Sequence, residues 1–277
     1  QTTYTDGNPR ALAFSGFGTA AGGTDTDTLQ GGAGADVFAV TAAGSVTLNA
    51  AQAFTGIETL SGLGGADDFN LDADFAGAVN GDGGTDDFNI NVTQASVLDG
   101  GEDSDTFTVA AGATLTGAGI RLTGGVDADS DASGAGGDDT DVLNVAAAGT
   151  GGTVTVALSG SEANLGFEGS EDTVFTDDGT FARIDSVVGS ANDTLQGRNV
   201  ASTWTQTTYT DGNPRALAFS GFGTAAGGTD TDTLQGGAGA DVFAVTAAGS
   251  VTLNSAQAFT GIETLSGLGG ADDFNLD

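Results

Sequence analysis

Apolar and polar residues alternate in short runs along this chain, and the runs recur directly after aspartates. In five runs, large apolar residues stand two and four positions after the aspartate: Phe38 and Val40 after Asp36, Phe69 and Leu71 after Asp67, Phe88 and Ile90 after Asp86, Phe107 and Val109 after Asp105, and Leu143 and Val145 after Asp141. Alternation with a period of two predicts β-strands with one face toward a core. We therefore expect stacked Phe side chains to be core rather than a platform for sugar rings.

A glycine-rich segment precedes these strands. In six segments a glycine stands five residues before the aspartate: Gly22, Gly31, Gly62, Gly81, Gly100 and Gly136 before Asp27, Asp36, Asp67, Asp86, Asp105 and Asp141. Because glycine tolerates positive φ, we interpret these segments as tight corners. The aspartates at 67, 86 and 105 are 19 residues apart, and the larger steps elsewhere leave room for an extra coil.

A third pattern spaces apolar residues by three, as in Phe14-x-x-Phe17, Phe54-x-x-Ile57-x-x-Leu60 and Phe181-x-x-Ile184-x-x-Val187. Pieces this short between glycine-rich corners predict strands and bends rather than helices. Long helices are also disfavoured because the chain has 49 Gly, each of which costs about 1 kcal/mol inside a helix.

The chain copies itself. Residues 1–72 return as residues 206–277 with a single change, Ala50 to Ser255. We therefore divide it into one full tandem repeat, 1–205, and the start of the next, 206–277. Since the sequence begins and ends inside a repeat, we expect it to be a window on a longer polymer.

A strand, a Gly-Asp corner and a further strand that returns after about 20 residues is the unit of a parallel β-solenoid. The expected fold is thus all-β: a parallel β-helix of stacked coils with Gly/Asp-rich turns, open at both ends. At about 4.8 Å per coil and roughly ten coils, one repeat would extend about 50 Å along the axis.

Composition adds a strong negative charge. Thirty-eight acids face five arginines, with no Lys or His, giving a formal charge of −33. Nucleic acid and anionic membranes would repel such a chain. No apolar run is long enough for a membrane helix, so we expect no membrane insertion in this window. The absence of Cys and Met suits an exposed extracellular location, and we expect a secreted protein of the cell surface or matrix.

The turns resemble the glycine-rich nonapeptide G-G-x-G-x-D-x-U-x of RTX (haemolysin-type) calcium-binding repeats, where U is a large apolar residue. Residues 31–39 and 236–244 match it in full. The stretches 181–197 and 201–204 resemble the long repeats of giant bacterial adhesins of the filamentous-haemagglutinin type. The resemblance implies calcium shared between successive turns by carboxylates and main-chain carbonyls. Only the turns ending at Asp27 and Asp36 are nine residues apart, however, and Leu63 and Asp82 replace the second glycine.

Aspartates at the corners are therefore the candidate ligands of Ca²⁺, which prefers six to eight oxygens. They are Asp27, Asp36, Asp67, Asp86, Asp105, Asp141, Asp193, Asp232, Asp241 and Asp272. Stacked carboxylates about 5 Å apart repel one another unless they are bridged, screened or protonated, which favours a metal. The alternative is that each side chain accepts main-chain N–H groups and binds no metal.

Two other features are less specific. The acidic stretch 127–141 begins like an EF-hand loop but lacks its glycine and closing glutamate, so we expect a solvated excursion. Trp204, Tyr4 and Tyr209 are candidates for a surface contact, including one with glycans, although isolated aromatics more often pack in a core.

Catalysis has little support, because without His, Cys or Lys the usual nucleophile–base pairs cannot form. We expect a structural protein: a stiff, calcium-stabilised fibre or stalk for bacterial adhesion, biofilm or matrix, whose partners are other copies of itself or the cell surface. Two alternatives stay open. One is a passive spacer of a monomeric adhesin whose binding head lies elsewhere, and the other is a β-helix carbohydrate-processing enzyme.

Overall fold

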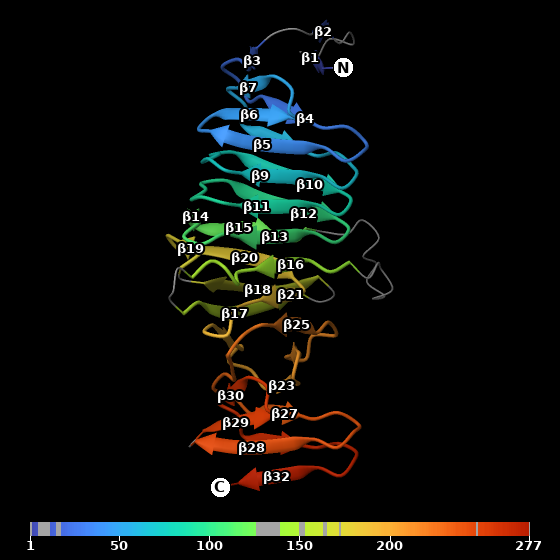
Figure 1. The fold of residues 1–277 in the computed structure, drawn as a ribbon, viewed down its shortest axis with the longest axis vertical. Helices are drawn as coiled ribbons and strands as arrows, with labels where there is room; N and C mark the ends of the chain where they lie inside the picture. The colour runs from blue at the N-terminus through green and yellow to red at the C-terminus, as the bar shows by residue number, and fades with distance from the viewer. Residues whose placement is uncertain are drawn as a thin grey trace.

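The computed structural model describes residues 2–4, 12–14, 18–125, 139–149, 153–162, 165–171, 173–247 and 249–276, with the backbone alone for the first two ranges. Within these ranges the chain forms β-strands and no helix, so the all-β prediction is confirmed. No helix that could cross a membrane is found in the same ranges. The strands are stacked along one long axis (Figure 1).

Most strands belong to two long sheets, each of 14 strands in the described part of the chain. In spatial order, sheet 1 contains β4 (Thr28–Gln30), β8 (Thr59–Ser61), β10 (Ala78–Gly83), β12 (Val97–Glu102), β15 (Gly119–Thr123), β20 (Gly179–Ile184), β18 (Gly166–Glu171), β17 (Thr155–Glu162), β22 (Thr194–Gln196), β26 (Thr224–Ala226), β30 (Ala258–Thr260), β29 (Ser250–Leu253), β28 (Val242–Ala247) and β32 (Asp273–Leu276).

Sheet 2 contains β3 (Thr19–Ala21), β7 (Ala53–Thr55), β6 (Ser45–Leu48), β5 (Val37–Ala42), β9 (Asp68–Leu71), β11 (Asp87–Ile90), β13 (Thr106–Val109), β16 (Val142–Asn144), β21 (Ser186–Val188), β25 (Leu217–Ser220), β24 (Thr208–Thr210), β23 (Ser202–Trp204), β27 (Asp232–Gln235) and β31 (Thr264–Ser266). Two small sheets pair β1 (Thr2–Tyr4) with β2 (Leu12–Phe14) and β14 (Leu115–Thr116) with β19 (Phe175–Thr176).

From β8 to β13, successive strands alternate between the two sheets, so that β8, β10 and β12 lie in sheet 1 and β9, β11 and β13 in sheet 2. We call one strand from each sheet a rung. Where the rungs are most regular, they pair in parallel at a shift of 19 residues, as in Phe69 with Phe88 and Phe88 with Phe107. This is the spacing that the aspartates predicted. It gives long, mostly parallel sheets, which are compatible with a solenoid.

Antiparallel hairpins occupy the larger steps, where an extra coil was expected. Between Asp36 and Asp67 the chain folds back through β6 and β7: β6 pairs antiparallel with β5, and β7 pairs antiparallel with β6. The turn from β5 to β6 needs only Ala43 and Gly44, and Gly44 has a φ of 69°. Two-residue hairpins require positive φ, which glycine supplies without steric cost. The same arrangement recurs in β28, β29 and β30.

The core is a column of side chains between the sheets. Phe38, Phe69, Phe88 and Phe107 are fully buried and stack with ring centroids 4.8, 4.9 and 4.6 Å apart. The prediction that these rings are core is confirmed. Trp204 and Tyr209 are also fully buried, with ring centroids 4.6 Å apart, so they are packing residues rather than a surface contact. The side chain of Tyr4 lies outside the described residues.

The two copies of the repeat are built on opposite sheets. Strands β5, β8 and β9 of the first copy belong to sheets 2, 1 and 2, whereas their equivalents β28, β31 and β32 belong to sheets 1, 2 and 1. One repeat therefore contains an odd number of passes between the sheets. In Figure 1, β5 and β28 nevertheless both cross the near face with their arrowheads to the left.

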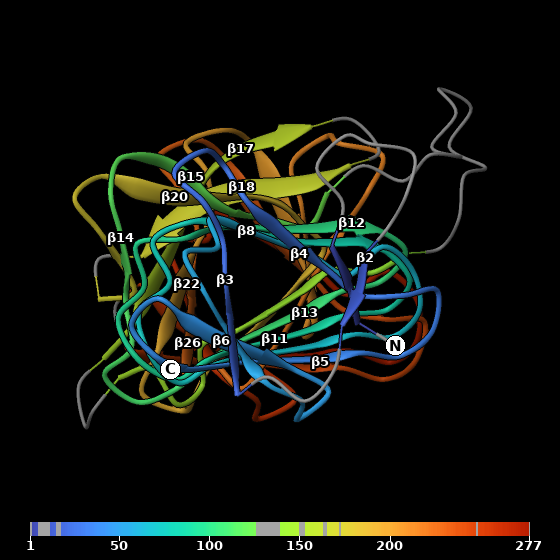
Figure 2. The same ribbon diagram turned by 90° about the horizontal axis from the view of Figure 1, so that it is seen from above.

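The position of each sheet around the long axis changes along the stack (Figure 2). Adjacent strands are rotated against each other in one direction, so the rotation accumulates along a sheet. Figure 2, seen down the long axis, shows β8, β22 and β26 of sheet 1 at successive positions around the outline. Sheet 1 thus occupies different positions around the long axis along the stack.

Candidate functional site

Aspartates from successive rungs form a continuous hydrogen-bonded row, which we call the carboxylate ladder. It consists of Asp36, Asp67, Asp86, Asp105, Asp141 and Asp185. Each of the first five donates its main-chain N–H to the side chain of the next: Asp36 to Asp67 Oδ1 (2.7 Å), Asp67 to Asp86 Oδ1 (2.7 Å), Asp86 to Asp105 Oδ1 (2.8 Å), Asp105 to Asp141 Oδ1 (2.9 Å) and Asp141 to Asp185 Oδ2 (3.3 Å). Five of the predicted site residues are thereby brought together.

The glycine five residues before each aspartate is needed for close approach. A Cβ on Gly81 would lie 2.2 Å from Asp86 Oδ2 and 2.3 Å from the carbonyl oxygen of Gly100 in the next rung. Gly62 and Gly100 are packed in the same way, and none of the three has positive φ. The expectation that these glycines supply positive φ was therefore wrong. Their φ angles are not positive, and glycine is needed because neighbouring atoms leave no room for a Cβ. Positive φ occurs instead at other turn positions, such as Leu63 (73°).

The turn before Asp141 differs from the sequence expectation. Gly136 and most of the acidic stretch 127–141 lie outside the described residues. The glycine packed against Asp141 is Gly124, where a Cβ would lie 2.1 Å from Asp141 Oδ2. A glycine much earlier in the chain thus occupies the position that the spacing rule assigned to Gly136.

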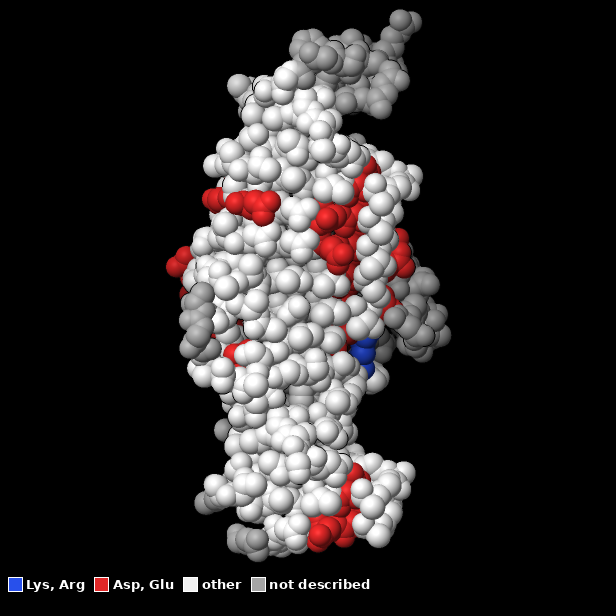
Figure 3. Space-filling model, in the orientation of Figure 1, with Lys and Arg blue, Asp and Glu red and all other residues white. Residues whose placement is uncertain are grey.

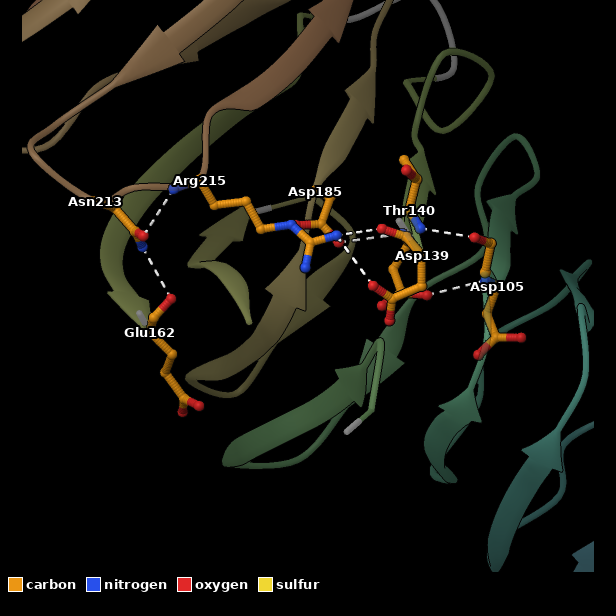
Figure 4. Close-up of polar contacts among 9 residues, drawn as sticks. Asp105, Asp139, Thr140, Glu162, Asp185, Asn213 and Arg215 are labelled. Atoms are coloured by element: carbon orange, nitrogen blue, oxygen red, sulfur yellow. Dashed lines mark hydrogen bonds and ion pairs between the residues drawn. The ribbon is translucent and has the colours of Figure 1, made fainter. Parts of the chain in front are cut away.

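Both ends of the ladder are closed by other side chains. At the first end, the Asn49 side-chain amide donates to Asp36 Oδ1. At the last end, Arg215 Nε lies 2.7 Å from Asp185 Oδ1, and Arg215 Nη2 lies 3.1 Å from Asp139 Oδ1 (Figure 4). Arg215 belongs to the second copy of the repeat, whereas the ladder belongs to the first.

Sequence reasoning missed Asp185, and with it Glu58 and Glu263. Glu58 Oε2 accepts the N–H of Asp27 (2.9 Å), and Glu263 Oε2 accepts that of Asp232 (2.8 Å). Each of these three acids directly follows a Phe-x-x-Ile pattern. The sequence signal for these residues is an acid directly after the Phe-x-x-Ile pattern. In these rungs no Gly-Asp corner supplies an aspartate, and this acid accepts the main-chain N–H of the neighbouring rung instead.

Burial raises the pKa of the ladder carboxyls. Loss of hydration raises the pKa of Asp105 to about 9 and that of Asp86 to about 7, because the charged form is disfavoured in a dry environment. The donated N–H groups oppose this shift and the neighbouring carboxylates add to it. Burial likewise raises the pKa of Asp141 to about 7 and that of Asp185 to about 6, and there the charge of Arg215 opposes it.

Three ladder aspartates keep one buried oxygen without a partner. Oδ2 of Asp67, Asp86 and Asp105 has no hydrogen bond, although these residues are at most 2% exposed. At Asp36 the corresponding oxygen accepts the N–H of Gly32. In the turn before Asp67, the matching N–H of Leu63 is instead 3.2 Å from Asp82 Oδ2. These three turns thus have a spare oxygen, which a proton or a cation would satisfy.

The remaining predicted site residues lie in separate, similar turns. Asp241 donates its N–H to Asp272 Oδ1 (3.0 Å), which repeats the start of the ladder in the second copy. Asp193 accepts the N–H groups of Val154 (2.9 Å) and Ser190 (2.6 Å). Asp27 and Asp232 accept N–H groups from their own turns, at Gly23 and Gly228. These contacts are the hydrogen-bonding roles that the alternative interpretation predicts.

The described residues bring together no group of three or more acidic side chains arranged to hold a metal ion. The ladder presents one carboxylate per rung, with Oδ1 already used by an N–H group, whereas Ca²⁺ prefers six to eight oxygens. Only one observation fits a cation. At three turns an Oδ2 has no partner, and each of these turns also has a main-chain carbonyl oxygen packed against its glycine. Calcium binding therefore stays a prediction, which concerns Asp67, Asp86 and Asp105 first.

Comparison with protein-family models, with curated proteins and with solved structures finds no match to this chain. The resemblance to calcium-binding and adhesin repeats accordingly rests on the sequence motifs.

Proposed function

We propose that this chain is part of a structural, extracellular bacterial repeat protein that stacks as a β-solenoid rod and serves in adhesion, biofilm or matrix. The observation that carries the proposal is the pair Phe69 and Phe274, one residue of the repeat in two positions of the stack. Phe69 is fully buried between neighbouring rungs, whereas Phe274 in the last described strand is 42% exposed.

Stacking is what buries the apolar residues. Phe69 has Phe38 on one side and Phe88 on the other, while Phe274 stacks on Phe243 alone at 4.8 Å. Leu276 is 69% exposed, whereas its equivalent Leu71 is fully buried. Burial of apolar surface contributes about 25 cal/mol per Å², so each added rung stabilises the one before it. A chain of this kind gains stability by growing longer, which suits a rod.

The negative charge of the chain favours separation between neighbouring rods. Figure 3 shows acidic side chains mainly along the right edge of the near face, in the upper half of the molecule and again near the lower end, with smaller groups on the left side. Asp82, Asp87 and Asp103 are among the exposed acids of the first copy. Like charges along a rod repel neighbouring rods, and salt or divalent cations screen that repulsion. In the proposed setting, calcium would tune the rod's stiffness and its lateral spacing.

The proposal is tested by the length of chains with one, two and three complete repeats beyond the present one. Small-angle scattering should give a maximum dimension that rises by an equal step, about 50 Å, with each repeat, while the cross-section stays constant. Electron microscopy of the longest chain should show straight, unbranched rods. A cross-section that grows with repeat number would contradict the proposal.

The same preparations separate a fibre from a spacer. A spacer sediments as a monomer of the expected length at every concentration, whereas a fibre-forming chain associates end to end or side by side. Turnover of an acidic or neutral glycan by the chain would instead support the carbohydrate-processing alternative.

A further inference from the structure

The chain repeatedly runs back on itself within one sheet. We call a set of three strands that pair antiparallel side by side in one sheet a zigzag. The described part of the chain contains four, which we number in chain order: zigzag 1 is β5–β6–β7, zigzag 2 is β17–β18–β20, zigzag 3 is β23–β24–β25 and zigzag 4 is β28–β29–β30. Zigzags 1 and 4 are the same segment in the two copies of the repeat.

Each zigzag reverses the order of its strands along the stack. Its first strand pairs in parallel with a later strand of the chain, and its last strand pairs with an earlier one. In zigzag 2, β17 pairs with β22 whereas β20 pairs with β15. Zigzags 1, 3 and 4 follow the same rule. A zigzag therefore adds three strands to its sheet where a single pass adds one, which puts that sheet about 10 Å ahead of the other.

The middle strands of the zigzags belong to the core. Each contributes a side chain that is at most 5% exposed: Val46 from β6, Phe167 from β18, Tyr209 from β24 and Val251 from β29. The apolar face of a sheet is buried only where another layer covers it. Extra strands in one sheet therefore need matching strands in the other sheet.

Successive zigzags alternate between the sheets. Zigzags 1 and 3 lie in sheet 2, and zigzags 2 and 4 lie in sheet 1. An even number of single strands of the two long sheets separates each zigzag from the next: β8 to β13 with β15 and β16, then β21 and β22, then β26 and β27. Because each single strand is a pass to the other sheet, an even number always starts the next zigzag on the opposite sheet. Both sheets accordingly reach 14 strands in the described part of the chain.

Zigzags of opposite sheets meet across the core. The ring of Phe167 in zigzag 2 packs edge to face on that of Tyr209 in zigzag 3, with centroids 5.7 Å apart. The ring of Trp204 in zigzag 3 packs in the same manner on that of Phe259 in zigzag 4, at 6.5 Å. All four side chains are fully buried. Zigzag 3 thus helps to cover the zigzag before it and the zigzag after it.

We propose that each zigzag compensates for the one before it, so that this fold accepts zigzags only where they alternate between the sheets. One step of the repeat, from β3 to its equivalent β26, contains three zigzags among the described strands. Because three is odd, the next copy has to begin on the other sheet, which is the exchange seen between β5 and β28. Adding one copy therefore exchanges the sheets for every later strand, and adding two restores them. The inference concerns the stacking of the described strands and does not depend on the proposed function.

Deletions that join register partners test the proposal. Removal of residues 142–185 joins Asp141 to Ser186, which then takes the place of its partner Val142. This deletion removes zigzag 2 together with β16. Zigzags 1 and 3, both in sheet 2, then follow each other, and sheet 1 cannot cover the extra strands.

A second deletion unbalances the sheets in the opposite direction. Removal of residues 194–223 joins Asp193 to Thr224, the register partner of Thr194, and removes zigzag 3 together with β22. Zigzags 2 and 4, both in sheet 1, then follow each other. A chain with both deletions keeps zigzags 1 and 4, which alternate, and each of its sheets has lost the same number of strands.

The chain with both deletions should be more resistant than either single-deletion chain, although it is shorter. We expect a protease of broad specificity to digest each single-deletion chain about tenfold faster than the parent, because uncovered strands open readily, and the double-deletion chain at nearly the rate of the parent. The matched control removes residues 68–86, one regular coil with one strand from each sheet, joins Asp67 to Asp87, and should resist like the parent. A double-deletion chain digested as fast as the single ones would overturn the proposal. Single-deletion chains as resistant as the parent would overturn it too.

A double-mutant cycle tests the same contact without shortening the chain. Phe167→Ala and Tyr209→Ala each remove one ring of a pair that meets across the core. If zigzags 2 and 3 cover each other, both substitutions together should lower the urea midpoint by less than the sum of the separate shifts. Phe167→Ala combined with Phe69→Ala, in a distant rung of sheet 2, should give additive shifts. Additive shifts for Phe167 and Tyr209 as well would mean that the two zigzags are held independently, which contradicts the proposal.

Discussion

The main-chain N–H of Asp86 donates to Oδ1 of Asp105, 2.8 Å away in the next rung, while Oδ2 of Asp105 remains buried and unpartnered. Oδ1 of Asp105 thus accepts a hydrogen bond from the neighbouring rung, whereas its Oδ2 has no hydrogen-bond partner. Replacing Asp105 with Asn keeps the acceptor and puts an N–H donor in place of the unpartnered oxygen. We expect Asp105→Asn to stabilise the metal-free chain at pH 8 by about 1–3 kcal/mol, because Asn supplies a donor without the proton that Asp105, with its pKa raised to about 9, must bind on folding.

Urea unfolding of the two chains at pH 8 measures this difference. Asp178→Asn is the matched control, because Asp178 is exposed and lies off the ladder, so it makes the same substitution without changing a buried contact. If both substitutions stabilised the chain equally, the effect would come from net charge and not from the ladder.

Stability should rise as the pH is lowered. The folded state raises the pKa of Asp185 to about 6, those of Asp86 and Asp141 to about 7, and that of Asp105 to about 9, from an ordinary value of 3.8. The folded chain therefore binds these protons more tightly than the unfolded chain. Their contribution is fully present below pH 4 and is lost as the pH rises through the range of about 6 to 9.

Thermal melting in chelator should accordingly give a higher Tm at pH 5 than at pH 8.5. Acid brings little opposing repulsion, because the chain has five Arg and no Lys or His. In Asp105→Asn the dependence on pH should be shallower above pH 7, where Asp105 titrates. A Tm that falls steadily on acidification would show that the ladder carboxylates are ionised and well stabilised in the folded chain.

The packed glycines should not tolerate a methyl group. Gly81→Ala places a Cβ 2.3 Å from the carbonyl oxygen of Gly100, a main-chain atom that cannot move without shifting a rung. We expect a loss of about 1–3 kcal/mol, typical of overpacking. Gly34→Ala, with nothing within 4 Å of its Cβ and no positive φ, should stay within about 0.5 kcal/mol of the parent. Equal losses in urea unfolding would argue against close approach as the reason for glycine at position 81.

The contribution of stacking to stability can be measured by replacing the equivalent residues Phe69 and Phe274 of the two copies. Phe69→Ala removes a fully buried ring between two others and should cost about 3–5 kcal/mol. Phe274→Ala removes the equivalent ring where it is 42% exposed and should cost about 1 kcal/mol. The residues that precede the two rings are the same but for Ala50 and Ser255, and the three residues after each ring are identical, so each substitution is the control for the other. Similar costs for both would mean that the neighbouring rung contributes little.

Calcium is expected to act through the spare oxygens of Asp67, Asp86 and Asp105. At 100 times its dissociation constant, an ion that binds only the folded chain would stabilise it by about 2.7 kcal/mol. Melting at pH 8 in millimolar Ca²⁺ and then in excess chelator measures this shift, and Asp86→Asn should reduce it while Asp178→Asn should not. Equal melting with and without Ca²⁺ would leave the ladder as a purely hydrogen-bonded element.

Much of the stack could be read from alternation alone. The apolar residues two and four positions after Asp67 and Asp86 are fully buried, since a period of two places them on one face wherever the strand pairs. Five of the ten predicted aspartates, Asp36, Asp67, Asp86, Asp105 and Asp141, lie in one hydrogen-bonded row, and their role as metal ligands stays a prediction. Asp185 was missed because it follows an apolar pattern and no glycine corner, so only its place beside Asp141 shows that it ends the ladder.

By itself, the sequence of this protein determined its local structure and its repetition: short strands, glycine corners, an inward column of Phe, and strand pairs β1–β2 and β24–β25 that share one register in the two copies. The tertiary structure alone decided which sheet each copy occupies, that Gly81 is packed and not strained, and that Arg215 meets Asp185. The physical reason is that alternation and turn chemistry act over a few residues. Sheet exchange, close packing and ion pairing depend instead on how many passes the chain has made and which rung lies next to which.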